Sequence, residues 1–581
     1  MSKHLRAGGA HPVTAALVYI MVGVWCTRGL WPEPASRLLR DNPHDQELFE
    51  WWLAWSAKAV GGLRDPFVTH AMNAPDGVNA MANTSVLLPG IVMAPVTWVF
   101  GPATSFALLT TLALPLTAIT THAVLRRFGA RPAGAFAGGL LIVVAPGLRS
   151  QTLAHLHMAM AFLVPLLVAE VAAVAAGSIQ ARRGGLRIGL LASAQLLMGE
   201  EWLAIAVLTC LAVLLSVAAR CPPELWRAAV IRLCRGTATA LLVAAPLVAL
   251  PLVVLFAGPE HAGGSPFDTK HYVADLRAFV TPSHLLAVSS PASDAHAARL
   301  GGGITEQTAY LGWPVLAWLA GAAVVLRRSR AVLVLLPAAL GLAVCAMGAE
   351  LTIDGRRTGI ALPWDLLGRL PLLDQALPGR IALAVVLLLA PVIACAVDRA
   401  VAALRHDAMA RVALVATAVV VSSLWPRPAA TTHAGAGPAP FRARLAPAAT
   451  ALLTVPIVSP STTAPLRWEA ARGLPDDLAG NYAITPDSRG HAQLGPSWTA
   501  TWQALDLALR SGRPKVVGAA SQAAVRADLR RQHVCTVAAI PDPRQRTYVA
   551  FLSAALGPPA SAGAAPVWQL CRTSGPPGSG A

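Results

Sequence analysis

Charged residues are scarce in this sequence. They make up 13% of the 581 residues, whereas 55% are hydrophobic and the mean hydropathy is +0.56. A soluble chain of this size cannot bury that much apolar surface, so the composition excludes an ordinary soluble enzyme and predicts a polytopic membrane protein. Lysine is almost missing, because only four of the 46 basic residues are Lys. Together with abundant Ala, Gly and Pro, that bias is typical of a GC-rich bacterial genome.

Several motifs of energy-driven and metal-binding proteins are also absent. The sequence has no Walker loop, no glycine-rich dinucleotide fingerprint after a strand and no zinc-ligand spacing, which argues against an ATP-driven pump. Six of the eight cysteines lie in or beside apolar segments. The other two, Cys535 and Cys571, stand alone in the C-terminal region and are candidates for a disulfide if that region is extracytoplasmic.

The net charge of +17 does not indicate a nucleic-acid partner. Most arginines fall in short loops between apolar segments, which is the positive-inside pattern of membrane proteins. We therefore expect a plasma (inner) membrane protein whose N-terminus is cytoplasmic. The clusters that mark the cytoplasmic side are Lys3 and Arg6; Arg126, Arg127 and Arg131; Arg182, Arg183 and Arg187; Arg220, Arg227, Arg232 and Arg235; Arg327, Arg328 and Arg330; and Arg399, Arg405 and Arg411.

Apolar segments between these clusters predict about eleven transmembrane helices. An odd number of crossings places everything after residue 426 outside the cell. The apolar run 86–101 is interpreted as interfacial or re-entrant, because one more crossing there would move the Arg126–Arg131 cluster outside. The predicted helices lie near 12–30, 103–125, 133–147, 155–176, 186–199, 202–219, 236–257, 309–326, 331–348, 380–397 and 410–425.

A change of composition divides the chain. Residues 1–425 form the predicted membrane domain, whose first extracytoplasmic loop is 31–102, and a Pro/Ala/Gly/Thr-rich linker follows at 426–440. Residues 441–581 alternate strand-like and helical segments, which predicts an extracytoplasmic α/β domain with a mostly parallel sheet. The expected strands are 450–457, 515–518, 534–540 and 566–570, and the expected helices are 497–511, 519–531 and 544–556.

Acidic residues gather directly after the first apolar segment. Residues 41–55 read Asp-Asn-Pro-His-Asp-Gln-Glu-Leu-Phe-Glu-Trp-Trp-Leu-Ala-Trp, so carboxylates precede an aromatic-rich amphipathic stretch. This arrangement indicates chemistry at a membrane surface. Asp41 and Asp45 are the candidate catalytic residues, although either one could instead cap the helix at 46–60, since Asp is a good N-cap.

Most other ionisable groups outside the arginine clusters fall in predicted outer turns. A charge at the core centre costs about 2.5–3.5 kcal/mol on insertion scales, so charges recessed into the membrane are functional candidates. The candidates for binding the donor phosphate or substrate are Arg149, His155, His157, Glu200, Glu201, Glu306, Tyr310 and Arg380.

These candidates also have structural interpretations. His155 and His157 are two residues apart and fall on different helix faces, which favours one packing residue and one cavity residue over a metal pair. Glu200 and Glu201 are equally compatible with a helix end in headgroup water. Arg380 begins a helix, where an arginine often anchors a phospholipid headgroup.

The layout resembles the GT-C superfamily, integral-membrane glycosyltransferases that use polyprenyl-phosphate sugars. The shared features are an N-terminal helix, a long first outer loop with an early Asp and a lateral amphipathic helix, many further helices and an external C-terminal domain. Within this superfamily the chain is similar to bacterial YfhO-type proteins. The similar stretches are 45–55, 65–67, 73–79, 83–85, 198–201, 309–314, 362–364 and 377–380.

The resemblance implies a single inverting displacement that transfers a hexosyl or pentosyl group. Asp45, with Asp41 as second choice, would take the proton of an acceptor hydroxyl on a cell-envelope glycan, lipid or protein. Arg149 or Arg380, helped by His157, would stabilise the departing phosphate, and the polyprenyl tail would lie among membrane lipids. The first loop lacks the tight Asp-Asp or Asp-Glu pair of some members, so the resemblance leaves a requirement for Mg²⁺ or Mn²⁺ open.

Two other classes of function remain alternatives. A transporter or a lipid or polysaccharide flippase would place polar residues at mid-membrane in matched halves, and the sequence has no internal repeat. A non-catalytic membrane scaffold with an external domain is the third interpretation.

Overall fold

The computed structural model describes residues 12–571, except 371–372, 405, 498, 500, 503–504, 506–518 and 562. The chain forms two compact units. Unit 1 comprises Met1–Asn42, Ala107–Ala249 and Phe267–Thr432, and unit 2 comprises Pro43–Phe106, Leu250–Pro266 and His433–Ala581. The first outer loop therefore groups with the C-terminal region, and the expected domain boundary at 426–440 stays a prediction.

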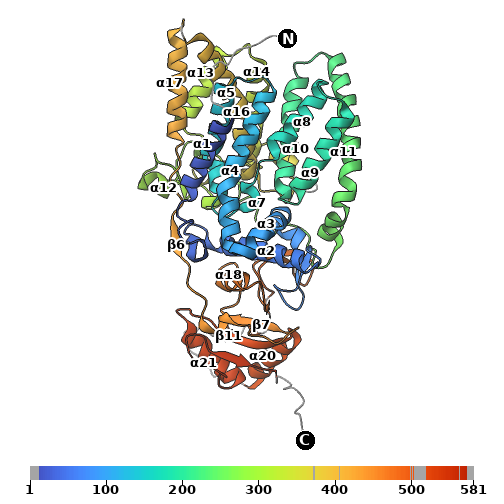
Figure 1. Ribbon diagram of the computed structural model, residues 1–581, viewed down its shortest axis with the longest axis vertical. Helices are drawn as coiled ribbons and strands as arrows, with labels where there is room; N and C mark the ends of the chain where they lie inside the picture. The colour runs from blue at the N-terminus through green and yellow to red at the C-terminus, as the bar shows by residue number, and fades with distance from the viewer. Residues whose placement is uncertain are drawn as a thin grey trace. The chain divides into compact units, whose positions relative to one another are not determined.

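Long helices make up most of unit 1 (Figure 1). Two of them, α4 and α11, also contribute residues to unit 2. The long helices are α1 (Pro12–Thr27), α4 (Pro102–Arg127), α5 (Pro132–Val144), α8 (Val164–Ala176), α9 (Ala181–Leu196), α10 (Glu200–Ala218), α11 (Pro223–Ala257), α13 (Trp313–Val325), α14 (Arg330–Ala346), α16 (Ala382–Ala403) and α17 (Ala408–Ser423).

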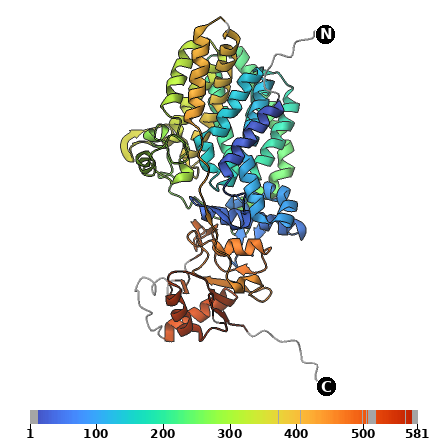
Figure 2. The same ribbon diagram turned by 60° about the vertical axis from the view of Figure 1, so that its left-hand side comes forward.

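Shorter elements connect these helices. The strands β4 and β5 pair as an antiparallel hairpin, drawn in yellow beside the helices of unit 1 in Figure 2. The short elements are η1 (Pro34–Ser36), β1 (Arg37–Leu39), α6 (Pro146–Gln151), α7 (Leu156–Ala159), η3 (Leu276–Phe279), α12 (Pro291–Ala297), η4 (Ile304–Glu306), β4 (Glu350–Ile353), β5 (Arg356–Ala361), α15 (Trp364–Leu367), η5 (Pro378–Ile381) and β6 (Thr431–His433).

The chain is a multi-pass membrane protein. Among the described residues, four helices are long and apolar enough to cross a bilayer: Pro102–Arg127, Glu200–Ala218, Pro223–Ala257 and Pro378–Ala403. Large apolar side chains on α11, such as Leu242, are exposed, as expected of a surface that faces lipid. The full set of eleven crossings and the orientation of the termini stay predictions.

Helix α16 is the centre of unit 1 and packs against α5, α14 and α17. Glycines allow α5 to approach closely, because a Cβ on Gly134 would collide with the Ala394 carbonyl and one on Gly138 would lie 3.0 Å from the Ala390 carbonyl oxygen. The Asp398 carboxylate on α16 accepts hydrogen bonds from the backbone N–H groups of Arg131 and Gly134, at 2.6 and 2.9 Å. The N-terminus of α5 is thereby capped.

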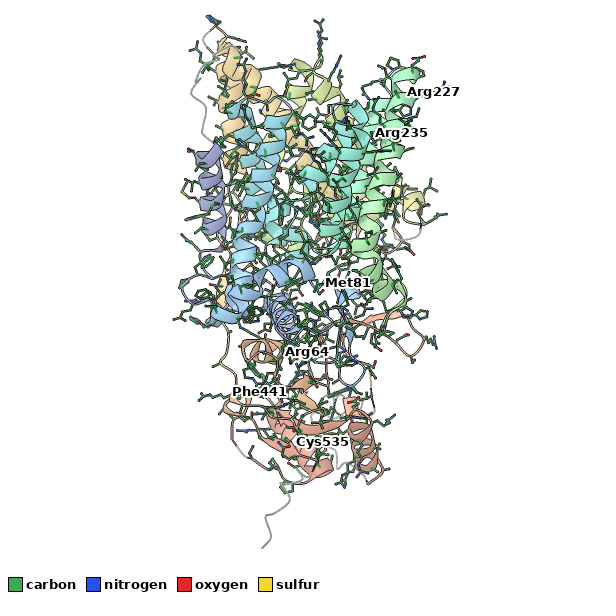
Figure 3. The ribbon with its side chains drawn as sticks, turned by 45° about the vertical axis from the view of Figure 1, so that its right-hand side comes forward. Arg64, Met81, Arg227, Arg235, Phe441 and Cys535 are labelled. Atoms are coloured by element: carbon green, nitrogen blue, oxygen red, sulfur yellow. A yellow bond between two sulfur atoms is a disulfide. The ribbon has the colours of Figure 1, made fainter. Side chains whose placement is uncertain are left out.

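Two helices differ most from their predicted bounds. The helix expected over 155–176 is divided into α7 and α8, and the new start at Val164 is explained by Pro165, which suits the first turn of a helix. Helix α11 starts at Pro223 instead of near residue 236, so the arginines at 227, 232 and 235 lie on the helix itself. Figure 3 labels Arg227 and Arg235 near one end of this helix. Their long side chains can extend from an apolar helix toward water.

Unit 2 combines the first-loop helices with a sheet. Helix α2 packs against both α3 and α18. The elements of unit 2 are α2 (Pro43–Gly61), β2 (Val68–Thr69), β3 (Val78–Asn79), η2 (Ala80–Asn83), α3 (Leu87–Phe100), η6 (Ala439–Arg442), β7 (Ala451–Val455), α18 (Ala464–Ala471), β8 (Asp477–Leu478), β9 (Ile484–Pro486), β10 (Ala492–Leu494), α20 (Ala519–Arg531), β11 (Val534–Ala539), α21 (Gln545–Leu556) and β12 (Val567–Gln569).

The main sheet of unit 2 has the strand order β12-β11-β7-β8. Strand β7 is parallel to β11 and β8, and β12 is antiparallel to β11. Helices α20 and α21 pack against β11, and the disulfide between Cys535 and Cys571 ties β11 to the end of β12; Figure 3 labels Cys535. Most of the helix expected at 497–511 and all of the strand expected at 515–518 lie outside the described residues.

Candidate functional site

Asp45 lies in the first turn of α2, within unit 2. Its side chain is half-buried, and the Tyr482 hydroxyl donates a hydrogen bond to its Oδ1 at 2.5 Å. An acidic residue in the first helical turn also interacts favourably with the helix dipole. The residue is therefore held in place and partly accessible, and both properties suit a group that meets a substrate.

The polar face of α2 is covered by residues of the C-terminal region. Thr463 contacts His44 Nδ1 at 2.7 Å and donates to Glu47 Oε2 at 2.5 Å, and Arg467 Nε lies 3.3 Å from Glu50 Oε2. The side chains of Glu50 and Arg467 are only 1% and 6% exposed. Burial raises the pKa of Glu50 to about 7, with the Arg467 charge opposing the shift, and burial also raises the pKa of Glu47.

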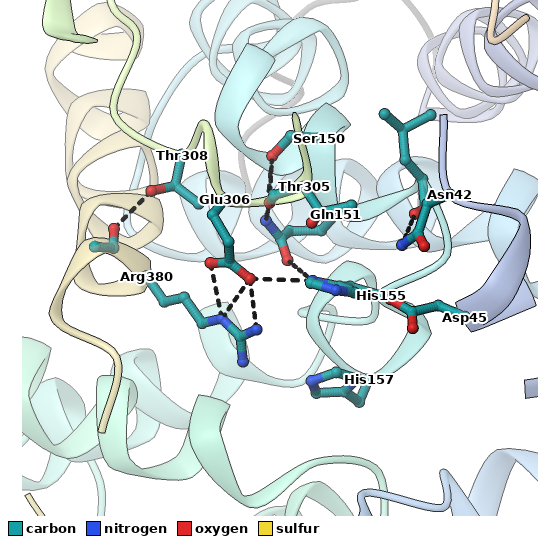
Figure 4. A network of polar contacts seen from close by, with 12 residues as sticks. Asn42, Asp45, Ser150, Gln151, His155, His157, Thr305, Glu306, Thr308 and Arg380 are labelled. Carbon is teal, nitrogen blue, oxygen red and sulfur yellow. Dashed lines mark hydrogen bonds and ion pairs between the residues drawn. The ribbon is translucent and has the colours of Figure 1, made fainter. Parts of the chain in front are cut away.

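Within unit 1, four candidate residues lie around Arg380, and Figure 4 labels three of them, His155, His157 and Glu306. Arg380 Nη1 donates to both oxygens of Glu201 at 2.6 Å, and its Nη2 donates to Glu306 Oε1 at 2.6 Å. His155 Nδ1 is 3.4 Å from Glu306 Oε1, and His157 Nε2 is 3.8 Å from Glu201 Oε1. We call these residues, His155, His157, Glu201, Glu306 and Arg380, the Arg380 cluster.

The backbone around the Arg380 cluster is fixed by further hydrogen bonds. The Thr308 hydroxyl donates to the Gly379 carbonyl at 2.6 Å, which joins the segment that follows η4 to η5. The Gln151 side chain donates to the Thr305 carbonyl at 2.5 Å and its Oε1 contacts His155 Nδ1 at 3.3 Å. Figure 4 draws the hydrogen bonds of Thr308 and Gln151 as dashed lines. Three segments distant in sequence are thereby held in one arrangement.

The Arg380 cluster contains one guanidinium and two carboxylates. The side chains of Arg380 and Glu306 are 9% and 7% exposed, whereas Glu201 is 31% exposed. With neutral imidazoles the cluster carries a net charge of about −1, so the carboxylates already satisfy the arginine. An added phosphate would have to compete with them, and Glu201 is the more accessible of the two.

Arg149 is placed elsewhere in unit 1. It is fully buried on α6 and donates to the Thr152 hydroxyl and, at 3.3 Å, to the Cys26 carbonyl. Among the described residues it forms no ion pair, and its Nε has no hydrogen-bond partner. Its positive charge is therefore not compensated by a carboxylate, in contrast to that of Arg380.

The remaining candidates are not part of the cluster's contacts. Glu200 is half-buried at the start of α10, and Tyr310 is packed in the apolar core of unit 1. Asp41, also in unit 1, accepts a hydrogen bond from His284 Nε2 at 3.0 Å. This bond lowers the pKa of Asp41 and raises the pKa of His284, so the pair favours a carboxylate with an imidazolium.

Sequence reasoning missed four residues that contact the acidic first-loop residues: Tyr482, Thr463, Arg467 and His284. All four are distant in sequence from the carboxylates that they contact. Tyr482 is one of only five tyrosines in the chain, which is the single sequence signal that could have drawn attention to it.

The sequence leaves open a requirement for a divalent cation, which would need several His, Cys, Asp or Glu side chains grouped as ligands. Within the part of the chain that the structure describes, no group of three or more His, Cys, Asp or Glu side chains is arranged to hold a metal ion. In the Arg380 cluster the two carboxylates converge on a guanidinium. These residues do not fit a metal centre.

The family model described as "Domain of unknown function (DUF6311)" matches residues 15–425. No curated protein matches the sequence.

Solved structures show the fold. The archaeal oligosaccharyltransferase AglB from Archaeoglobus fulgidus, in complex with an inhibitory peptide and a dolichol-phosphate, is similar with a TM-score of 0.50 and 10% identity, over 94% of this chain and 71% of that one. Arabinofuranosyltransferase AftD from Mycobacteria is similar with a TM-score of 0.55 and 14% identity, over 99% of this chain and 41% of that one. Both are GT-C proteins, so the GT-C resemblance is confirmed for the fold, while the YfhO-type grouping stays a prediction.

Proposed function

The chain belongs to the DUF6311 family, and from that membership and its GT-C fold we propose that it is a membrane glycosyltransferase. It transfers a sugar from a polyprenyl-phosphate donor to an extracytoplasmic glycan, lipid or protein of the cell envelope. The dolichol-phosphate in the AglB complex supports a lipid-linked donor. In this proposal the protein resides in the plasma membrane, with a cytoplasmic N-terminus and an extracytoplasmic α/β domain.

The observation that carries the proposal is the Arg380 cluster. Its members come from four segments of unit 1, and the Arg380–Glu306 and Arg380–Glu201 contacts span 74 and 179 residues of sequence. Buried ionisable groups in a membrane protein are costly and usually serve a function. A mixed set of carboxylates, imidazoles and a guanidinium supplies both donors and acceptors, which is what the hydroxyl groups of a sugar require.

Asp45 is the proposed catalytic base. Its carboxylate takes the proton of the acceptor hydroxyl while the acceptor oxygen forms a bond to the anomeric carbon. The bond between that carbon and the phosphate oxygen breaks, and the electron pair leaves with the polyprenyl phosphate. A single displacement of this kind inverts the anomeric configuration. Asp41 is the second choice, because its carboxylate is already engaged by His284.

Two arginines are candidates for the leaving phosphate, and their charges differ. Arg149 has no carboxylate partner among the described residues, and an uncompensated buried guanidinium is costly unless an anion joins it. Arg380 can accept a phosphate only by exchanging a carboxylate, for which the more exposed Glu201 is suited. His157, beside Glu201, is placed to donate to the same phosphate.

The test is transfer of radiolabelled sugar in membranes that contain the full chain. Polyprenyl-phosphate donors carrying glucose, galactose, mannose or arabinofuranose serve as probes. We expect label to reach the envelope fraction from at least one donor, and Asp45→Asn to reduce transfer about 100-fold or more, as loss of a general base does. Asp76→Asn, an exposed carboxylate in the same unit, is the matched control and should transfer like wild type.

The outcomes separate the parts of the proposal. Equal transfer by wild type and Asp45→Asn would remove Asp45 as the base. If the wild-type protein transfers label from none of the four donors, the proposal that it is a glycosyltransferase using these donors is rejected.

A further inference from the structure

The first two turns of α2 are bound by the C-terminal region at almost every polar position. His44 and Glu47 contact Thr463, Glu50 contacts Arg467, and Asp45 contacts Tyr482. All of these residues belong to unit 2. The helix that carries the proposed base is therefore built together with the C-terminal region, although more than 400 residues separate Asp45 from Tyr482.

The position of Tyr482 is fixed by two asparagines from the first loop. The Asn481 side chain donates to Asn73 Oδ1 at 2.7 Å and is fully buried. On the other side of Tyr482, Asn83 accepts from the Ile484 backbone N–H at 2.5 Å and donates to the Ile484 carbonyl at 2.9 Å. Amide groups thus hold the chain before and after Tyr482, so its hydroxyl is presented to Asp45 without further ordering.

The contact leaves Asp45 able to react. Tyr482 and Asp45 are both half-buried, and the phenol donates to one carboxylate oxygen, Oδ1. A hydrogen bond between a phenol and an ionised carboxylate is charge-assisted and stronger than a neutral one. It restricts the rotamer of the aspartate and so orients the carboxylate. A base that is oriented in advance spends less free energy on reaching the reactive geometry.

We propose that Tyr482 is a positioning residue for Asp45, supplied by the C-terminal region to the first-loop helix. The inference rests on the proposed function, because it deepens the role of the same aspartate. It assigns to the C-terminal region a direct part in orienting the catalytic base. The proton of the acceptor hydroxyl goes to the Asp45 carboxylate, while the Tyr482 proton stays on the phenol throughout.

The activity experiment compares Tyr482→Phe with Tyr548→Phe in the full chain. The phenylalanine keeps the ring and removes only the hydroxyl. We expect Tyr482→Phe to lower kcat about 10- to 100-fold, a part of the contribution of a general base, with KM for donor and acceptor unchanged. Tyr548, buried in the same unit with its ring near Arg544, is the matched control and its variant should react like wild type.

Two further readouts distinguish positioning from a loss of structure. In an Asp45→Asn background, Tyr482→Phe should cause no additional loss, because the tyrosine acts through the carboxylate. The melting temperatures of Tyr482→Phe and Tyr548→Phe should agree. An additional loss in the double variant, or a fall in melting temperature that accounts for the lost activity, would overturn the proposal.

A labelling experiment tests the contact without any activity. The full chain in membranes is treated with a water-soluble carbodiimide and a glycine ester, and modification of Asp45 is followed by peptide mass spectrometry. We expect Asp45 to react about tenfold faster in Tyr482→Phe than in wild type, since a charge-assisted hydrogen bond is lost.

The two experiments separate the inference from the proposed function. Equal Asp45 labelling in the two proteins overturns the positioning role, whether or not any donor is used. Faster labelling together with no sugar transfer by wild type supports the contact and rejects the glycosyltransferase.

Discussion

The Arg380 cluster of unit 1 and the Glu50–Arg467 pair of unit 2 differ in how far their side chains are exposed. In unit 1, one guanidinium faces two carboxylates, because Arg380 binds both Glu201 and Glu306. In unit 2, Arg467 binds Glu50, and Glu50 also accepts a hydrogen bond from Gln46 at 2.8 Å. The first arrangement has an accessible member, Glu201, whereas the second is enclosed.

This difference in exposure indicates which of the two arrangements is structural. Glu50 and Arg467 satisfy each other with almost no exposed surface, so their contact serves to join α2 to α18. In the Arg380 cluster, Glu201 is half-buried and remains accessible to another molecule. We therefore infer that the Arg380 cluster supplies substrate-binding groups, and that the Glu50–Arg467 contact is a rigid support, within unit 2, for the helix that carries Asp45.

The largest effect is expected when Arg380 is replaced by methionine. Glu201 and Glu306 would lose their shared cation, and an uncompensated buried charge costs about 3–5 kcal/mol. We expect a large fall in the melting temperature of the purified protein and no detectable transfer. Arg369→Met removes an exposed helical ion pair with Asp365 and is the matched control, with an effect of about 0–1 kcal/mol. Equal melting temperatures for Arg380→Met and Arg369→Met would contradict the ion pairs of Arg380 with Glu201 and Glu306.

A smaller, pH-dependent effect is expected for Glu50→Gln. Burial raises the pKa of Glu50 from 4.5 to about 7, so the folded state binds this proton more tightly than the unfolded state. The group therefore costs stability progressively as the pH rises from about 4.5 to about 7, by roughly 3 kcal/mol in total. Glutamine does not titrate, so this part of the pH dependence should disappear from the melting temperature of the variant.

The control for this measurement is Asp76→Asn, which alters an exposed carboxylate of the same unit. It should keep the wild-type pH dependence between pH 4.5 and 7. A Glu50→Gln protein with the same pH dependence as wild type would show that Glu50 is not a buried titrating group.

The sequence predicted the membrane class and most helix positions because apolar runs and arginine-rich loops are local signals. Pro165 shows where such signals fail: the hydrophobic pattern continues through it, yet it starts a new helix. Arg227 and Arg235 show a second failure, because charges interpreted as a loop lie on α11. A hydrophobicity pattern records neither the proline in the first turn of α8 nor the ability of long arginine side chains to extend from α11 toward water.

The sequence identifies the residues of the Arg380 cluster as candidates, but it does not predict which of them contact one another. Arg380, Glu201 and Glu306 were all recognised as recessed ionisable groups, but nothing in their spacing says that the arginine binds both glutamates. Tyr482 carries no local pattern at all, and its role depends on the fold of residues more than 400 positions away. Side-chain chemistry can be inferred from sequence, whereas pairing across loops requires the tertiary structure.

The smallest effect is expected for Glu201→Gln, which also separates the two arginines. The variant keeps the size of the side chain and removes the charge that a phosphate must displace from Arg380. If Arg380 holds the donor phosphate, KM for the donor should fall severalfold, at most about tenfold for a gain of 1.4 kcal/mol. Glu33→Gln, an exposed glutamate of unit 1, should leave KM unchanged. A higher donor KM in Glu201→Gln would instead make Glu201 a ligand of the sugar, and would assign the phosphate to Arg149, whose charge has no carboxylate partner among the described residues.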